Sequence, residues 1–524
     1  MASSTTALNA TVAGHPKENS SSFEDPVLLR TTFALAMSTM YKAEVPLYGH
    51  LVRIVQNVNQ SKVPSMEEAQ RLTLERHGAI RLGTSLELQT VRRIFALIGM
   101  YPVGYYDLAV AGLPMHATCF RPIERESLQR NPFRVFTTLL RPELLQSDAA
   151  KDIALKLLKS RSIFSDRLME LLDLGERQGN RLTEDQAEAF IPAALRTFSW
   201  QGIAAASLPQ YQLLKSEHPI LADIACFRSA HINHLTPRTL DIDEAQAAMV
   251  QEGMAVKSRI EGPPARICPI LLRQTSFLAL EEKILFPLTD MHTSHNVDSG
   301  KDAASELSQG SHQARFGEIE ERGAAATVKG RHLYDMLLDK AMQMANSIAA
   351  DPPTTDKIMR EAFEEYPDSW TELRRQGLVY FEYRLTGKRI DTFDINKEDP
   401  GTAVLEKLIA GGLIEAIPIT YEDFLPFSAA GIFQSNLQTP SSSVRETSAG
   451  RSTSDLQGFE SALGDHVFNL DELYIQRQNE SLTACARALG LNEQDLVEEY
   501  REGPSNGPPN KTVSNVSETG AVGT

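Results

Sequence analysis

Hydrophobic residues recur at helical spacing along much of this chain, and shorter apolar runs separate the helical segments. Spacings of three and four residues predict helices over 26–58, 84–98, 148–221, 241–254 and 329–349, a helix from 65 toward 83, and two short helices over 470–500. Runs rich in β-branched and aromatic residues predict strands over 101–120, 131–140, 224–236, 266–273, 315–323, 378–384 and 413–420. We therefore expect an α+β protein in which the helical block 148–221 separates two β-containing halves.

Polar composition marks both ends and two internal segments. The leader 1–22 and the tail 501–524 are expected to be disordered, with one catalytic unit over 23–500 between them. Segments 292–312 and 438–458 are expected to be polar insertions. His292, His295 and His312 are interpreted as loop histidines, because a mobile, solvated loop holds a metal poorly.

The first candidate functional residues are His77 and Arg81. In a helix that continues through Gly78, they would be i,i+4 neighbours on one face, so that a base and a cation point into the same space. The alternative is an ordinary helix end, where both side chains interact with the C-terminal dipole and Gly83 ends the last turn.

Two further histidines, His231 and His234, lie in the predicted strand 224–236. Successive side chains of a strand point to opposite faces, so only one of the two can point inward if the strand is regular. His234 is favoured because its face also carries the apolar Ile232, and His231 is the alternative.

A pair of acids, Glu318 and Glu320, shares one face of the predicted strand 315–323 with Phe316. Two acids in an apolar setting need a cation, which a metal or an arginine would supply. An edge strand that shows charge to water is the other explanation. Glu318 is the favoured ligand, and Glu320 is either its alternative or an acceptor for a ligand imidazole.

Two histidines and one carboxylate form the set that binds iron(II) in non-haem oxygenases and leaves adjacent positions open. Arg81 beside such a site could hold a substrate carboxylate with two hydrogen bonds. The same ligands would suit a zinc-dependent lyase or hydrolase, in which metal-bound water is the nucleophile. A non-catalytic binding protein is the third hypothesis.

Three other segments carry weaker signals. Arg121 could bind an anion, although a structural ion pair is favoured, and Arg384 is a candidate for substrate charge. Small residues in the segment 424–434 would let backbone N–H groups approach a ligand, or they form a tight turn without function.

Composition narrows the function classes. Lys+Arg 52 against Asp+Glu 68 gives a net charge of -16, which opposes a nucleic acid backbone. Four cysteines without a CxxC pair argue against a disulfide framework and favour a reducing compartment. The first 22 residues lack an apolar core and arginine, and no apolar run reaches the ~18–20 residues that span a bilayer. We expect a cytoplasmic protein with neither a nucleic acid nor a membrane as its partner.

Taken together, the motifs resemble the 2-oxoadipate dioxygenase/decarboxylase family, also called D-2-hydroxyglutarate synthases. The resemblance runs from about residue 23 to 500 and rests on the segments 77–81 (HGAIR), 231–238 (HINHLTPR), 316–323 (FGEIEERG), 116–122 and 424–434. It implies a vicinal-oxygen-chelate-like mixed β-barrel core with extensive helical insertions. It also implies iron(II) held by two His and one Glu, and conversion of 2-oxoadipate and dioxygen to D-2-hydroxyglutarate and carbon dioxide in lysine breakdown.

Site residues carry over to this chain by motif. The resemblance implies that His77 is a metal ligand and that Arg81 binds the substrate. It places the second ligand within 231–234 and the Glu within 318–320. The segment around Phe427 and Ser428 is similar to the substrate-lining loop of the family.

Overall fold

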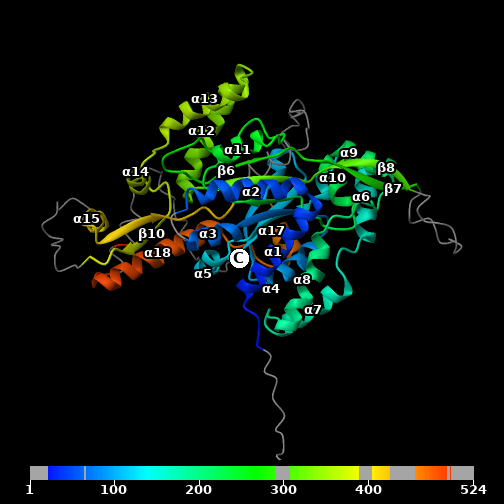
Figure 1. The fold of residues 1–524 in the computed structure, drawn as a ribbon, viewed down its shortest axis with the longest axis horizontal. Helices are drawn as coiled ribbons and strands as arrows, with labels where there is room; N and C mark the ends of the chain where they lie inside the picture. The colour runs from blue at the N-terminus through cyan, green and yellow to red at the C-terminus, as the bar shows by residue number, and fades with distance from the viewer. Residues whose placement is uncertain are drawn as a thin grey trace, which may run out of the picture. The chain divides into compact units, whose positions relative to one another are not determined.

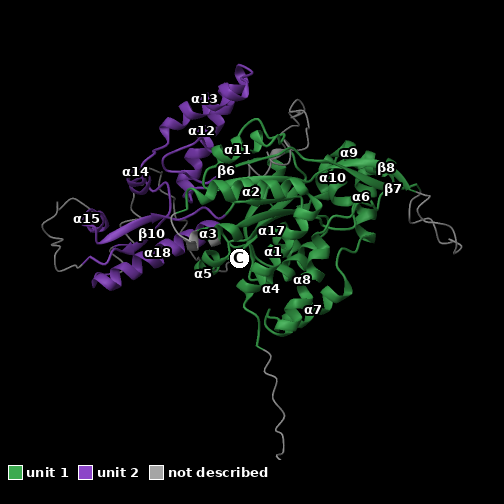
Figure 2. Ribbon diagram, in the orientation of Figure 1, with its two compact units in different colours: residues 1–261, 273–321, 423–469 green, residues 262–272, 322–422, 470–524 purple. Residues whose placement is uncertain are grey.

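The computed structural model describes residues 22–63, 66–288, 307–388, 404–424, 455–492 and 496. The chain divides into two compact units (Figure 2): the first comprises Met1–Glu261, Arg273–Glu321 and Asp423–Asn469, and the second Gly262–Leu272, Arg322–Glu422 and Leu470–Thr524. The expectation of one catalytic unit over 23–500 stays a prediction. Residues 1–21, 501–524 and most of both expected insertions lie outside the described residues.

A seven-stranded mixed sheet forms the centre of the first unit (Figure 1) and curls into a half-barrel. Its order is β2 (Tyr101–Asp107), β3 (Met115–Arg121), β4 (Arg134–Leu140), β1 (Arg76–Leu82), β5 (His234–Pro237), β9 (Phe316–Arg322) and β6 (Leu272–Ser276). Strands β1, β3, β4 and β5 are buried along their whole length. The expected α+β class and the barrel-like core are thereby confirmed.

Helices α1 (Pro26–Glu44) and α2 (Pro46–Gln60) confirm the predicted helices over 26–58. The side chain of Asp25 caps the first helix, and Pro46 starts the second, because proline suits a first helical turn and disfavours helix at the residue before it. The Tyr41 hydroxyl of α1 lies 2.8 Å from the carbonyl oxygen of Asn233 and 2.7 Å from that of Phe316. It thus ties the starts of β5 and β9 to one helix.

The helical block predicted over 148–221 is present. It comprises α6 (Asp148–Ser160), α7 (Asp166–Arg177), α8 (Glu184–Phe198), α9 (Leu208–Glu217) and α10 (Pro219–Ala225). Thr183 and Gln186 form a capping box that begins α8. The remaining helices of this unit are α3 (Met66–Leu74), α4 (Ser85–Leu97), α5 (Arg125–Arg130), α11 (Ile242–Gln251) and α17 (Leu456–Leu463).

Three predicted elements are wrong, two in the first unit and one that lies almost wholly in the second. The helix expected to continue to Gly83 ends at Leu74, and 76–82 is the strand β1, because this fully buried segment pairs with β4 on one side and β5 on the other. The strand expected over 224–236 is limited to β5, since α10 extends to Ala225. In the strand predicted over 266–273, the ladder begins only at Leu272.

His312 is not a loop residue, contrary to our expectation. It lies in β8 (Leu307–Gln313), which forms a hairpin with β7 (Glu281–Pro287), and it is 4% exposed. The run Leu-Ser-Gln-Gly-Ser-His alternates too weakly in hydrophobicity to predict a strand. His292 and His295 lie outside the described residues.

The second unit contains a two-stranded sheet of β10 (Phe381–Leu385) and β11 (Ile414–Pro418). Its helices are α12 (Val328–Ser347), α13 (Pro352–Ala362), α14 (Trp370–Arg375), α15 (Val404–Ala410) and α18 (Leu470–Leu489). Helix α18 accounts for the first part of the region 470–500, where two short helices were predicted, and most of 493–500 lies outside the described residues. Among the described helices of both units, none combines the length and hydropathy needed to cross a bilayer.

Two glycines allow close packing behind the central strands. Leu235 of β5 pairs with Gly78 of β1 on one side and with Gly317 of β9 on the other. A Cβ atom at Gly317 would lie 2.5 Å from the ring of Phe277 and 2.9 Å from Leu51, both of which are buried. The absence of a side chain here therefore lets the core approach the strands that carry the candidate site.

We expect Gly317→Ala to lower the free energy of unfolding by about 1–3 kcal/mol, the usual cost of overpacking a core. Gly49→Ala is the control, because its added Cβ would meet no atom closer than 4.0 Å and alanine favours a helix. Urea unfolding of both variants measures the difference. Equal stability of Gly317→Ala and the wild type would contradict the close packing.

Candidate metal centre

The register of the central strands places the predicted site residues on one face of the sheet. Strands β1 and β5 are antiparallel, with Ala79 opposite His234. Directly paired residues share a face, as do residues two apart along a strand. His77 and Arg81, two residues to either side of Ala79, therefore share the face of His234.

The next strand adds the two acids to the same face. Strands β5 and β9 are parallel, with His234 opposite Phe316. Phe316, Glu318 and Glu320 then alternate onto that face, as the sequence pattern predicted. The i,i+4 helical argument for His77 and Arg81 is replaced by strand alternation, which also puts residues four apart on one side.

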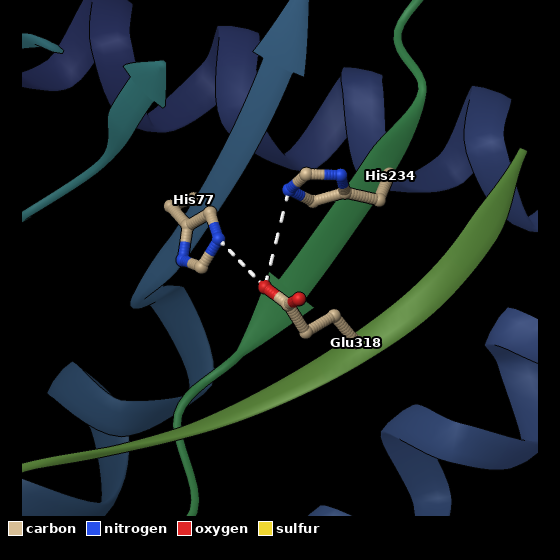
Figure 3. A group of neighbouring side chains, drawn as sticks. All are labelled: His77, His234 and Glu318. Carbon is tan, nitrogen blue, oxygen red and sulfur yellow. Dashed lines mark hydrogen bonds and ion pairs between the residues drawn. The ribbon is translucent and has the colours of Figure 1, made fainter. Parts of the chain in front are cut away.

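His77, His234 and Glu318 converge from β1, β5 and β9 (Figure 3). The Glu318 Oε1 atom lies 3.1 Å from His77 Nε2 and 4.0 Å from His234 Nε2. One potential ligand atom from each residue lies within 4.8 Å of the other two, and all three residues are buried. The structure thus brings together the three residues that the sequence analysis favoured as ligands.

Three phenylalanine rings lie around the cluster of His77, His234 and Glu318. The ring centroid of Phe424 lies 4.8 Å from that of His77, and the ring of Phe316 lies 4.7 Å from that of His234. Phe136 packs against Phe424 at 5.3 Å. These rings hold the imidazoles in place and give the site an apolar surround, in which charged groups interact strongly.

Electrostatics of the cluster fit a cation. Glu318 and Glu320 are both fully buried, and a buried charge is costly unless it is paired. Within the described part of the chain, Glu318 Oε2 and His234 Nδ1 have no hydrogen-bond partner. Burial raises the pKa of Glu318, and burial together with His77 and Arg81 holds the pKa of His234 well below its usual value. A neutral imidazole and an under-satisfied carboxylate are the donors that a divalent metal needs.

Glu320 lies on the other side of His77. Its Oε2 atom is 3.0 Å from His77 Nδ1, although the angles are not those of a hydrogen bond. Burial lowers the pKa of His77, but the carboxylates of Glu320 and Glu318 outweigh this, so the pKa lies above its usual value. A carboxylate behind a ligand imidazole is a common outer partner in metal sites, and it raises the basicity of the ligand.

A group of charged residues that sequence reasoning missed lies beside Glu320. Glu75 is fully buried and lies 3.1 Å from both Arg134 and Arg238, while Arg134 lies 3.9 Å from Glu320. Burial raises the pKa of Glu75, but Arg238, Arg71 and Arg134 outweigh it and lower the pKa to about 2. No spacing in the sequence indicates that these residues meet, since they come from different segments.

Arg81 and His231 belong to a neighbouring group. Arg81 forms a buried ion pair with Asp223, and His231 Nε2 lies 3.1 Å from the same carboxylate. His231 precedes β5 in a segment without regular structure, so strand alternation does not govern it. The structure therefore separates His231 from His77, whereas it brings His234 to His77.

The other candidates have different surroundings. Arg121 forms a two-bond ion pair with Asp423, which is the structural role that we favoured. Arg384 belongs to the second unit, where it donates to Glu382 and its side chain is 48% exposed. Phe427 and Ser428 lie outside the described residues.

Comparisons with known proteins show which family the chain resembles. The family model described as 2-oxoadipate dioxygenase/decarboxylase matches residues 33–436. A protein of that name from Pseudomonas putida is 45% identical over 482 residues, which cover 90% of this chain and 98% of the relative. One from Escherichia coli is 46% identical over 469 residues, covering 87% and 97%.

Solved structures show the same relationship. The crystal structure of the hydroxyglutarate synthase from Pseudomonas putida in complex with 2-oxoadipate superposes with a TM-score of 0.75 at 42% identity, covering 90% of this chain and 99% of that one. A second crystal structure of the hydroxyglutarate synthase from Pseudomonas putida gives a TM-score of 0.74 at 41% identity, covering 90% of this chain and 99% of that one. The match extends over most of both chains. The chain therefore belongs to the 2-oxoadipate dioxygenase/decarboxylase family.

Proposed function

We propose that this protein is an iron(II)-dependent dioxygenase that converts 2-oxoadipate and dioxygen to D-2-hydroxyglutarate and carbon dioxide, in the cytoplasm and in lysine catabolism. The convergence of His77, His234 and Glu318 in a buried, apolar setting is the observation that carries the proposal. The names of the relatives supply the substrate and the reaction class.

Two imidazoles and one carboxylate favour iron(II) for this chemistry. Such a set leaves adjacent positions open, where iron(II) would bind the 2-oxo acid and dioxygen together. The zinc-dependent lyase or hydrolase uses the same ligands but needs no dioxygen. Oxygen consumption therefore separates the two hypotheses.

Other residues of the protein would bind the substrate, orient a ligand imidazole and exclude water. Arg81, on the same sheet face as the ligands, would pair with the substrate carboxylate that is remote from the keto group. Glu320 would fix the orientation of the His77 ring through Nδ1. Phe424 and Phe316 keep water from the reacting atoms.

The reaction balances without a second organic substrate. The C1–C2 bond of the oxo acid breaks and C1 leaves as carbon dioxide, while one oxygen atom from dioxygen completes the new carboxylate. The second oxygen atom is inserted into a C–H bond of the adjacent carbon. Each of these two steps supplies two of the four electrons that reduce dioxygen.

Iron binding is expected to depend on the three convergent residues. We expect His77→Ala and Glu318→Gln to weaken iron(II) binding by at least about a hundredfold, since loss of even an outer partner costs about 10–100-fold. Anaerobic titration with iron(II), followed by metal analysis, measures this. His466→Ala is the matched control, because the His466 side chain is 93% exposed. Undiminished iron binding by both site variants would contradict the ligand assignment.

Dioxygen is expected to supply two atoms to one product. With ¹⁸O₂, we expect hydroxyglutarate to gain two labelled atoms, one in the new carboxylate and one in the hydroxyl group, and mass spectrometry measures the shift. In an anaerobic assay of the iron-loaded protein we expect no carbon dioxide. Carbon dioxide release without oxygen, or turnover by the zinc-loaded protein, would favour the lyase or hydrolase instead.

Arg81 is expected to select dicarboxylic oxo acids. Arg81→Met should lower kcat/KM for 2-oxoadipate by about a hundredfold, because the remote carboxylate of the bound substrate loses its cation. The kcat/KM for 2-oxohexanoate, which ends in a methyl group, should change by less than about fivefold. Arg167→Met is the control, since Arg167 is a surface residue paired only within its own helix turn. Equal losses with both acids would contradict the selective role.

A further inference from the structure

A second buried cluster of the first unit is centred on Asp223. The Oδ1 atom of Asp223 lies 3.1 Å from His231 Nε2 and 2.8 Å from His312 Nε2. The Oδ2 atom accepts from Arg81 Nη1 and, at 3.3 Å, from Asn233 Nδ2. All five residues are buried, and Asp223 comes from α10, whereas Arg81 comes from β1.

The carboxylate of Asp223 is satisfied without an ion, although His231 Nδ1 and Asn233 Oδ1 have no hydrogen-bond partner among the described residues. Both imidazoles donate to Asp223 if each carries its proton on Nε2. His312 Nδ1 then accepts from the Tyr211 hydroxyl at 3.0 Å. The carboxylate thus receives four donors, two on each oxygen atom, which satisfies most of its accepting capacity.

The cluster differs in this respect from the candidate metal centre. Asp223, His231 and His312 also have potential ligand atoms within 4.8 Å of one another. Glu318, however, keeps one oxygen atom without a hydrogen bond among the described residues, whereas both oxygen atoms of Asp223 are bonded. The guanidinium of Arg81 already supplies the positive charge that a metal would bring.

Arg81 needs such an anchor. An arginine side chain loses rotamer entropy when it is held in one conformation, and fixing it before the substrate arrives removes that cost from binding. A carboxylate alone would also neutralise the guanidinium. Because His231, His312 and Asn233 share the negative charge of Asp223, Arg81 is held while its attraction for a second carboxylate is preserved.

We propose that Asp223, held by His231 and His312, is a positioning residue that orients Arg81 toward the remote carboxylate of the substrate and thereby sets the preference for dicarboxylic 2-oxo acids. The inference rests on the proposed function, because that function pairs Arg81 with the remote carboxylate of the substrate. It concerns residues that neither bind the metal nor contact the reacting carbon atoms. The pattern of KM values across two substrates tests it.

Asp223→Asn is the first test variant. It is expected to raise KM for 2-oxoadipate by about ten- to a hundredfold, the range that a small misplacement of a binding group produces. Values for 2-oxohexanoate, which has a methyl group in place of the remote carboxylate, should change by less than about threefold. Asp152→Asn makes the same chemical change at an exposed position and should leave both KM values unchanged.

His312 gives a second pair of variants, which decides the matter if Asp223→Asn does not fold. His312→Leu removes a donor and should raise KM for 2-oxoadipate selectively, whereas His312→Gln keeps an N–H donor and should restore most of the wild-type value. Iron content should remain one ion per chain in every variant. Equal effects on both acids, or loss of a second bound metal ion from His312→Leu, would overturn the inference. A wild-type protein that is inert toward 2-oxoadipate would instead contradict the proposed function, and with it the ligand assigned to Arg81.

Discussion

Two carboxylates with no exposure to water, Glu318 and Glu320, set the main constraint on this structure. Burying two like charges is unfavourable unless positive charge is supplied from within the protein or by a bound ion. Arg134 lies near Glu320, whereas Glu318 contacts His77, His234 and the Thr236 hydroxyl, and the charge of Lys257 also lowers its pKa. The cation that we propose beside Glu318 would supply further positive charge at this point of the sheet.

The central sheet fixes the positions of the three converging side chains. His77, His234 and Glu318 come from three adjacent strands, β1, β5 and β9, so their spacing follows from backbone hydrogen bonds and not from loops. Glycines behind the strands let the core pack closely, and Tyr41 ties β5 to β9 at their starts. The buried ion pair with Asp223 likewise holds Arg81, for which we propose a role in substrate binding, in one orientation.

The sequence allowed the convergence of His77, His234 and Glu318 to be predicted, but not the strands that bring them together. The preference for His234 over His231 assumed a regular strand through both residues, whereas β5 begins only at His234. The shared face of Glu318 and Glu320 followed from a spacing of two. By contrast, the strand at 76–82 was predicted as a helix, because an interior strand buried on both faces carries no alternation. Asp223, Glu75 and His312 gave no signal, since their roles depend on partners that lie far away in the sequence.

Anomalous diffraction at the iron absorption edge, from crystals loaded with iron(II) under anaerobic conditions, tests the central claim most directly. The account predicts one strong peak per chain between His77 Nε2, His234 Nε2 and the Glu318 carboxylate, and none at Asp223. A peak at the Asp223 cluster, or a fully loaded protein with no density beside His77, would contradict it.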